Sequence, residues 1–365
     1  MDKVGILTFH AAHNYGSMLQ AYALKHVINL LGFDSYIINY RNQRQQKLYS
    51  VFSVGIKTQV FHLLHLRKYI KRYHAFEKYL VNALTDLPCM TSMSDVANLV
   101  KNFKAIVTGS DQIWNQSANT YDADMIYLLP FPFNGKKIAY APSMGSDIDV
   151  NFIKDNLLKY MEDYSALSAR EIKLADCLGK LMNKKMETVL DPTLLVDENL
   201  WDEQLVPIKE RGYICFYSLI YSDDLVKLTL EAARLLDLEV INLSPRAKYA
   251  SISSFKQKYD VGPKEFVSYI KNADLVITNS FHGTVFSIIE ETPLFSVILD
   301  KNKPDFRRQN LFQITQLNDM YFDVLDINTL KDRFERLKDT DYALVKQRIG
   351  EAKKASIEYL KKALS

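Results

Sequence analysis

The alternation of short apolar runs with longer helical patterns constrains the fold of this chain more than any other feature. In the first half, the apolar runs predict strands 4–9, 35–40, 103–109, 137–143, 165–170 and 186–191. Helical patterns lie between several of them, over 18–31, 57–83, 151–163 and 171–181. Strands that alternate with helices are typical of a parallel sheet covered on both faces. We therefore expect an α/β fold with mostly parallel sheets.

The alternation starts again after VLDPTLLVDENLW, residues 189–201. The second series predicts strands 212–219, 238–244, 274–280 and 294–300, and helices 223–236, 263–272 and 284–291. A chain of 365 residues, 48% of them hydrophobic, is too long for one typical core. We predict one domain over 1–195 with a helical insertion near 45–83, and a second over 196–340, meeting near 192–210. A charged helix over 341–365 can pack back on the first domain.

Composition argues against several classes of protein. The net charge of +3 gives little support to a polyanionic partner, so no nucleic acid is expected. Three cysteines lie far apart without a CxxC pair, which fits a reducing compartment. The N-terminus does not read as a signal peptide, and no apolar run is long enough to span a bilayer. We therefore expect a cytoplasmic protein.

The stretch 57–83 has an unusual charge balance. From Lys57 to Lys78 it carries six Lys or Arg and one acid, Glu77, and its apolar residues follow a helical period. A basic amphipathic helix can lie on an anionic membrane surface, which would make the protein weakly peripheral to a membrane. The alternative, which we favour, is a solvated face on a helix that packs on its own domain.

Small and polar residues gather where the predicted strands end. In doubly wound sheets, ligands bind beyond the carboxyl ends of the strands, so these residues are the candidates for a binding site. They are Asn14, Gly16 and Ser17 in HNYGS, Gly109, Ser110 and Asp111 in TGSDQIW, Ser143 in YAPSMGS, Arg170 in SAREIK, and Asn279, Ser280, His282, Gly283 and Thr284 in NSFHGT. Turns need small residues, but they do not need Asp, Arg and His as well.

Each charged or ionisable candidate has a binding role and a structural alternative. His282 precedes a predicted helix, where it can serve an anion as a cation or proton donor, or else cap the helix or pack in the domain interface. Arg170 has a planar guanidinium group that can bind a carboxylate or phosphate through two N–H groups, or it can form an ion pair with a neighbouring acid. Asp111 can accept a proton from a hydroxyl, or cap its turn.

Metal and nucleotide cofactors have weak support. His10 and His13 form an HxxH pair, but no acid or Cys cluster accompanies them, so we predict no metal site. Neither GxGxxG nor GxxxxGK[ST] occurs in the chain. The LDPT turn at 190–193 is interpreted as a hinge between the domains.

Taken in order, several segments resemble the polysaccharide pyruvyl transferase family. They are GILTFHAAHNYGSMLQAYAL, VTGSDQIWN, YAPSMG, SAREIK, VLDPTLL, ADLVITNSFHGTVFSII and, more weakly, DFRRQNLF. The likeness spans about residues 4 to 312. The helical insertion and the tail after 312 are its two departures from the family pattern.

The resemblance implies two Rossmann-like domains facing a cleft, in a GT-B-like fold. It implies phosphoenolpyruvate as co-substrate, no cofactor, a sugar or lipid-linked saccharide as acceptor, and a pyruvate ketal as product. His282 matches the family's motif histidine and would interact with the phosphate, as a hydrogen-bond donor or general acid. Arg170 matches the motif arginine and would hold the donor, and Asp111 is the candidate base. The alternatives are a glycosyltransferase that uses a nucleotide sugar, and a non-catalytic carbohydrate-binding protein on the same fold.

Overall fold

A computed structural model describes residues 1–42, 46, 70–116, 125–145, 148–258, 260–303 and 305–365. The chain divides into two compact units. Unit 1 comprises the described residues within Met1–Leu64, Phe76–Val196 and Gly350–Ser365, and unit 2 those within His65–Ala75 and Asp197–Ile349. None of the described helices combines the length and apolarity needed to cross a bilayer.

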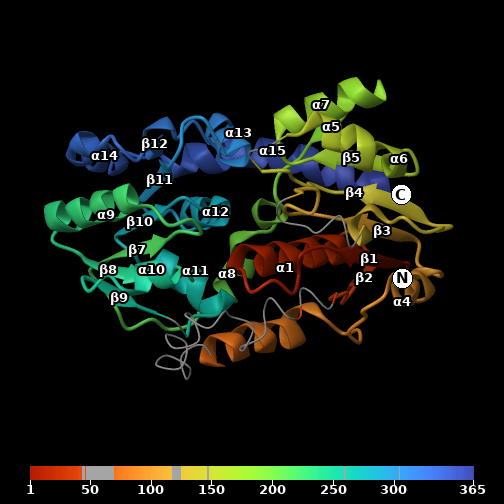
Figure 1. Cartoon of the computed structure of the whole chain (residues 1–365), viewed down its shortest axis with the longest axis horizontal. Coiled ribbons are helices and arrows are strands. Elements are labelled where there is room, and N and C mark those ends of the chain that lie inside the picture. The colour runs from red at the N-terminus through yellow and green to blue at the C-terminus, as the bar shows by residue number, and fades with distance from the viewer. Residues whose placement is uncertain (43–45, 47–69, 117–124, 146–147, 259, 304) are drawn as a thin grey trace. The chain divides into compact units, whose positions relative to one another are not determined.

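Unit 1 is built on a six-stranded sheet whose pairs are all parallel, in the order β2-β1-β3-β4-β5-β6 (Figure 1). Its strands are β1 (Lys3–Leu7), β2 (Asp34–Ile37), β3 (Ala105–Thr108), β4 (Lys136–Ala139), β5 (Ala166–Ala169) and β6 (Glu187–Thr188). Its helices include α1 (Tyr15–Leu30), α4 (Met93–Val100), α5 (Val150–Phe152), α6 (Leu158–Met161) and α7 (Ile172–Met182). A further helix over 70–79, extended by a π turn (Leu80–Leu84), passes from unit 2 into unit 1 at Phe76.

Unit 2 contains a second six-stranded parallel sheet, in the order β12-β11-β10-β7-β8-β9. Its strands are β7 (Tyr213–Tyr217), β8 (Glu239–Asn242), β9 (Phe255–Gln257), β10 (Leu275–Thr278), β11 (Leu294–Ile298) and β12 (Tyr321–Asp323). Its helices are α8 (Glu198–Asp202), α9 (Asp223–Leu236), α10 (Ala247–Ala250), α11 (Pro263–Lys271), α12 (Phe281–Ile289), α13 (Phe306–Thr315) and α14 (Leu330–Leu337).

The central strands are buried on both faces, which explains their sequences. Every residue of AIVT in β3, YICFY in β7 and LVIT in β10 is buried. A strand with helices on both sides has no solvated face, so an apolar run replaces the usual apolar–polar alternation. These runs are the signal from which the parallel sheets were predicted.

The last helix, α15 (Tyr342–Leu364), runs from unit 2 into unit 1. Within unit 1 its residues bond to loops and strand ends of the first sheet. The Tyr359 hydroxyl donates to the carbonyl of Ala139 over 2.9 Å, and the Leu190 amide donates to Ser356 Oγ, also over 2.9 Å. In Figure 1 this helix is drawn in blue near β4 and β5.

Some boundaries differ from those predicted. The helix expected at 284–291 begins at Phe281, because the Ser280 side chain caps it. The helix expected at 151–163 is broken into α5, a π turn (Ile153–Leu157) and α6. Of the helix expected over 57–83, and of the insertion expected near 45–83, residues 57–69 and most of 45–56 lie outside the described residues.

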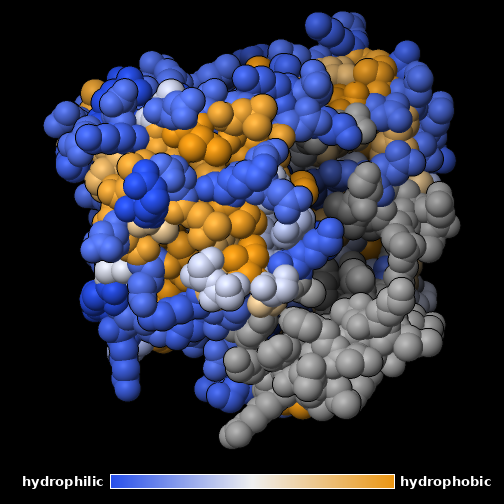
Figure 2. All heavy atoms as spheres, turned by 60° about the vertical axis from the view of Figure 1, so that its left-hand side comes forward, coloured by the Kyte–Doolittle hydropathy of each residue, from blue (hydrophilic) through white to orange (hydrophobic). Residues whose placement is uncertain are grey.

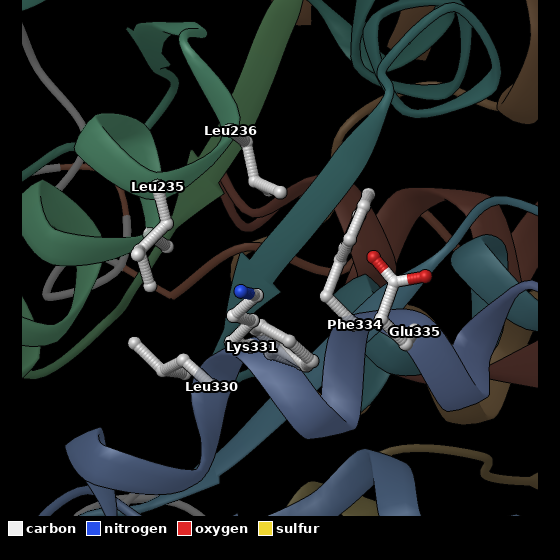
Figure 3. Close-up of a pocket in the computed structure, with 8 residues that line it drawn as sticks. Leu235, Leu236, Leu330, Lys331, Phe334 and Glu335 are labelled. Carbon is white, nitrogen blue, oxygen red and sulfur yellow. The ribbon is translucent and has the colours of Figure 1, made fainter.

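Unit 2 carries an apolar groove of about 210 Å³ between α9 and α14, over β11. Leu235 and Leu236 of α9 line one side, and Leu330 and Phe334 of α14 line the other (Figure 3). Figure 2, in which the left-hand side of Figure 1 comes forward, shows extensive apolar surface on this face of the protein. None of the residues predicted to bind substrate lines this groove.

Candidate active site

In unit 1, the N-terminus of α1 meets the carboxyl end of β3. Asn14 is the N-cap of α1, and its side chain accepts a hydrogen bond from the Ser17 amide over 3.3 Å. Gly16 and Ser17 are buried in the first turn. Ser17 Oγ donates to Asp111 Oδ2 over 2.5 Å, so the helix start is bonded to the segment that follows β3.

Asp111 is held in place through both carboxylate oxygens. Oδ2 accepts from Ser17, and Oδ1 accepts from the backbone amide of Gln112 over 2.8 Å. Its φ of 70° lies in the left-handed region, which short polar residues tolerate better than most. The bond to Gln112 is the turn-capping role that was the alternative for this residue.

Arg170 follows β5 and lies between two aspartates. Its guanidinium donates to Asp191 Oδ2 over 2.5 Å, and it lies 3.7 Å from Asp111 Oδ1. The side chains of Arg170 and Asp191 are 2% and 0% exposed. The ion pair with a neighbouring acid, one of the two roles weighed for Arg170, is therefore present.

Asp191 was not among the predicted site residues, because the LDPT turn was interpreted as a hinge. Its Oδ1 accepts from the Thr193 amide and hydroxyl, and Oδ2 also accepts from Ser110 Oγ over 3.3 Å. An Asp directly before Pro, after a strand, is a helix-start signal that could have drawn attention to it. Here it begins a short 3-10 helix (Pro192–Leu194).

Glu171, which follows Arg170, was also missed by the sequence analysis. It is 1% exposed, and the Ser143 hydroxyl donates to its Oε1. The Gly145 amide donates to the same oxygen over 3.3 Å. Ser143 therefore connects the loop after β4 to the loop after β5, and its hydroxyl is already used in that contact.

Gly109 occupies a position that no side chain fits. Its φ is 116°, and a Cβ atom there would lie 2.0 Å from the backbone oxygen of Tyr140. We expect Gly109→Ala to lower the free energy of unfolding of unit 1 by more than about 1 kcal/mol, since strain and clash add. Gly32→Ala is the control: its φ is 89°, but nothing lies within 4 Å. Urea titration of both variants tests this, and equal losses would contradict it.

The two histidines of the HxxH pair have separate partners. His10 is 1% exposed, and its Nε2 lies 3.2 Å from Asn39 Oδ1. Burial lowers the pKa of His10. His13 Nε2 lies instead 3.1 Å from Glu77 Oε1. Among the described residues, no group of three or more His, Cys, Asp or Glu side chains is placed to hold a metal ion.

In unit 2, the remaining candidates surround the junction of β10 and α12. Ser280 is the N-cap of α12, and His282 lies in its first turn, 6% exposed. A Cβ on Gly283 would meet Thr278 Oγ1 at 2.6 Å, so only glycine lets the helix approach the strand this closely. Asn279 accepts from the Leu219 amide over 3.2 Å, which ties this junction to the end of β7.

Arg308 of α13 completes this second cluster. Thr284 Oγ1 shares a hydrogen bond of 2.8 Å with Ser296 Oγ, and Arg308 donates to Ser296 Oγ over 3.2 Å. Arg308 also donates to the Val297 carbonyl over 2.9 Å and lies 3.5 Å from Asp305. The segment DFRRQNLF had been noticed only as a weak resemblance, and nothing in its sequence distinguished Arg308 from Arg307.

The predicted residues therefore form two clusters, one at the carboxyl end of each sheet. In unit 1, Asn14, Gly16, Ser17, Gly109, Ser110, Asp111, Ser143 and Arg170 belong to connected loops. In unit 2, Asn279, Ser280, His282, Gly283 and Thr284 belong to one strand–helix junction. A helix N-terminus with hydroxyls, an imidazole and an arginine nearby is chemically suited to an anion such as phosphate.

Solved structures with the same fold include two UDP-GlcNAc 2-epimerases. That of Neisseria meningitidis, bound to UDP-GlcNAc, is 10% identical, with a TM-score of 0.56 over 99% of this chain and 100% of that one. That of Methanocaldococcus jannaschii is 15% identical, with a TM-score of 0.53 over 93% and 94% of the two chains. These likenesses establish the fold class as two parallel-sheet, Rossmann-like units of GT-B type.

Family membership comes from a different comparison. No curated protein matches the chain significantly. The family model for polysaccharide pyruvyl transferase matches residues 14–301, more than half of the chain. The matched region begins at Asn14, the N-cap of α1, and contains Asp111, Arg170 and His282. The chain belongs to the polysaccharide pyruvyl transferase family.

Proposed function

We propose that this protein transfers pyruvate from phosphoenolpyruvate to two hydroxyls of a sugar in a surface polysaccharide or exopolysaccharide, forming a ketal. The acceptor is a sugar or a lipid-linked saccharide. The methylene carbon of the donor gains a proton and becomes a methyl group, while C2 exchanges its phosphate for two sugar oxygens. The two hydroxyls release two protons, of which one balances the new methyl group and the other leaves with the phosphate.

The observation that carries this proposal is the strand–helix junction of unit 2 in a chain of this family. His282 lies in the first turn of α12, next to the N-cap Ser280, where backbone amides and the helix dipole favour an anion. We assign His282 to the leaving phosphate, as a hydrogen-bond donor or general acid. Arg308, 5% exposed and bonded to Ser296, adds a fixed positive charge to the same cluster.

The residues of unit 1 receive roles of a different kind. The ion pair with Asp191 favours a positioning role for Arg170 over the direct contact with the donor that the resemblance implied. Through its 3.7 Å approach to Asp111, Arg170 fixes the carboxylate that also receives the Ser17 hydroxyl. In this proposal, Asn14, Gly16 and Ser17 shape the surface that the substrate contacts.

The reaction needs no metal in this proposal, because His282, Arg308 and backbone amides bind the phosphate. We expect titration calorimetry to give the same affinity for phosphoenolpyruvate in buffer treated with a chelator and in buffer with added Mg²⁺. Phosphate alone should bind more weakly, since it lacks the carboxylate. Loss of donor binding on chelation would contradict the metal-free proposal.

Incubation with isotopically labelled phosphoenolpyruvate tests the function itself. The enzyme should release phosphate and transfer label to a saccharide acceptor, in a product whose label is lost on mild acid treatment, as expected of a ketal. A panel of nucleotide sugars, including UDP-GlcNAc, forms the second arm, because the structural neighbours named above act on that compound. Transfer from the nucleotide sugars alone would replace the proposal with glycosyl transfer, and activity in neither arm would favour a binding protein.

A further inference from the structure

Besides His282, a histidine of unit 1, His13, has surroundings that suit a general base. His13 directly precedes Asn14, the N-cap of α1, at the carboxyl end of β1. Its Nε2 lies 3.1 Å from Glu77 Oε1, and the Arg41 guanidinium lies 3.1 Å from Glu77 Oε2. The three side chains are 12%, 24% and 20% exposed for His13, Glu77 and Arg41, so they are held by the protein but reachable from solvent.

Two contacts orient the imidazole ring of His13, one at its edge and one on its face. The edge is bonded to Glu77, and the face stacks on the ring of Phe76, with centroids 5.1 Å apart and planes 20° apart. Phe76 is fully buried and also stacks on Tyr15, the first residue of α1. A base whose ring is already oriented loses less freedom when its substrate binds.

The charge of Glu77 determines which nitrogen of His13 carries the proton. Burial raises the pKa of Glu77, but the hydrogen bond with His13 and the charge of Arg41 outweigh it and leave this pKa below its ordinary value. An ionised carboxylate only accepts hydrogen bonds, so Nε2 of His13 must be the donor. In the neutral ring, Nδ1 then carries the lone pair. Carboxylate, imidazole and acceptor hydroxyl in series are the arrangement that activates nucleophiles in unrelated enzymes.

Asp111, the base suggested by the sequence, is less suited to this task. Ser17 and the Gln112 amide already donate to its two oxygens, and Arg170 lies 3.7 Å away. Each oxygen keeps a second lone pair, but both are already bound to donors that hold the carboxylate to the start of α1 and to the following residue. His13 and Asp111 both belong to unit 1, so the two candidate bases can be compared within one unit.

We propose that His13 is the general base that activates an acceptor hydroxyl, and that Glu77 is its positioning residue; this inference rests on the proposed pyruvyl transfer. Once the methylene carbon has gained its proton, Nδ1 takes the hydroxyl proton while the oxygen forms a bond to C2 of the pyruvyl group. The bond from C2 to the phosphate oxygen then breaks, and its electrons leave with the phosphate. The resulting imidazolium is stabilised by the Glu77 carboxylate. It releases the proton to water, so that the ring is neutral before the next turnover.

The test measures kcat and KM for both substrates in His13→Ala, with His26→Ala, a substitution of the histidine within α1, as the matched control. General base catalysis is worth about 10²- to 10⁴-fold, so we expect a loss of kcat of that size with donor affinity unchanged. Added imidazole should restore at least part of the lost rate in His13→Ala. It should have no effect on the wild type or on His26→Ala, which should keep wild-type kcat.

Two further variants cover the case in which His13→Ala does not fold. His13→Gln can still donate to Glu77 but cannot take the proton, and should lose kcat to a similar extent without a change in thermal midpoint. Glu77→Gln should lose less, about tenfold, since it keeps the base but not its orientation. A kcat within threefold of wild type in a folded His13 variant, or a loss that imidazole does not restore, overturns the assignment. Absence of phosphoenolpyruvate turnover in the wild type would instead refute the proposed function.

Discussion

His282→Ala should lower kcat for pyruvyl transfer by about 10²- to 10⁴-fold, the range that general acid catalysis contributes. The reason is positional: His282 lies in the first turn of α12, where an anion binds and where its ring can serve the departing phosphate. His282→Gln keeps a hydrogen-bond donor but not the proton. It should therefore recover part of any loss in donor affinity and little of the lost rate. Steady-state phosphate release, measured with calorimetric donor binding, separates the two effects.

Packing is the competing role for a histidine that is only 6% exposed. If His282 serves mainly to fill space, the alanine variant should lose thermal stability and keep its specific activity. His74→Ala is the matched control, because that histidine belongs to unit 2 and is exposed. An alanine variant at position 282 with full activity, or one with the melting loss of a core truncation, would remove His282 from the mechanism.

The strand ends that carry the site could be predicted because apolar strands and polar loops have different sequences. LVIT and AIVT are buried on both faces, and the residues that follow them are small and polar. Since parallel strands end at the same edge of a sheet, the position of the candidate loops followed from the strands alone. The three-residue strands β9 and β12 were missed, because three residues carry no measurable periodicity.

The start of α12 was predicted three residues too late for a specific reason. Glycine is a poor helix former, so Phe281, His282 and Gly283 did not look like a first turn. The structure shows why glycine is nevertheless placed there. A Cβ atom at position 283 would lie 2.6 Å from Thr278 Oγ1, so only glycine allows the helix to pack this closely on the strand. As a consequence, His282 is part of the helix rather than of the loop before it.

The contact between Arg170 and Asp191 could not be predicted from either segment. The two residues are 21 positions apart and follow adjacent strands, β5 and β6. Arg170 was expected to contact either a ligand or an unspecified acid, and Asp191 was interpreted as part of a hinge, because each motif was interpreted by itself. Their pairing depends on the register of two strands whose side-chain patterns do not specify it.

Asp191→Ala should therefore be the most destabilising of the substitutions considered, at about 3 kcal/mol. Removing one partner of a buried ion pair leaves an uncompensated charge, which typically costs about 3–5 kcal/mol. Asp111, 3.7 Å from Arg170, retains part of the compensation, so the lower end applies. The exposed Asp176 of α7 provides the control, and its alanine variant should change stability by less than about 0.5 kcal/mol.

The measurement must report on unit 1 alone, because a chain of two units need not unfold in one step. The chain has two tryptophans, Trp114 in unit 1 and Trp201 in unit 2, both buried. In a Trp201→Phe background, urea titration followed by Trp114 fluorescence isolates the first unit. The double variant Arg170→Met, Asp191→Leu should recover part of the loss, since it removes the two most buried charges while Asp111 keeps its hydrogen bonds from Ser17 and the Gln112 amide. A double variant as unstable as Asp191→Ala would contradict the explanation that the charge left on Arg170 is the main cause of the loss.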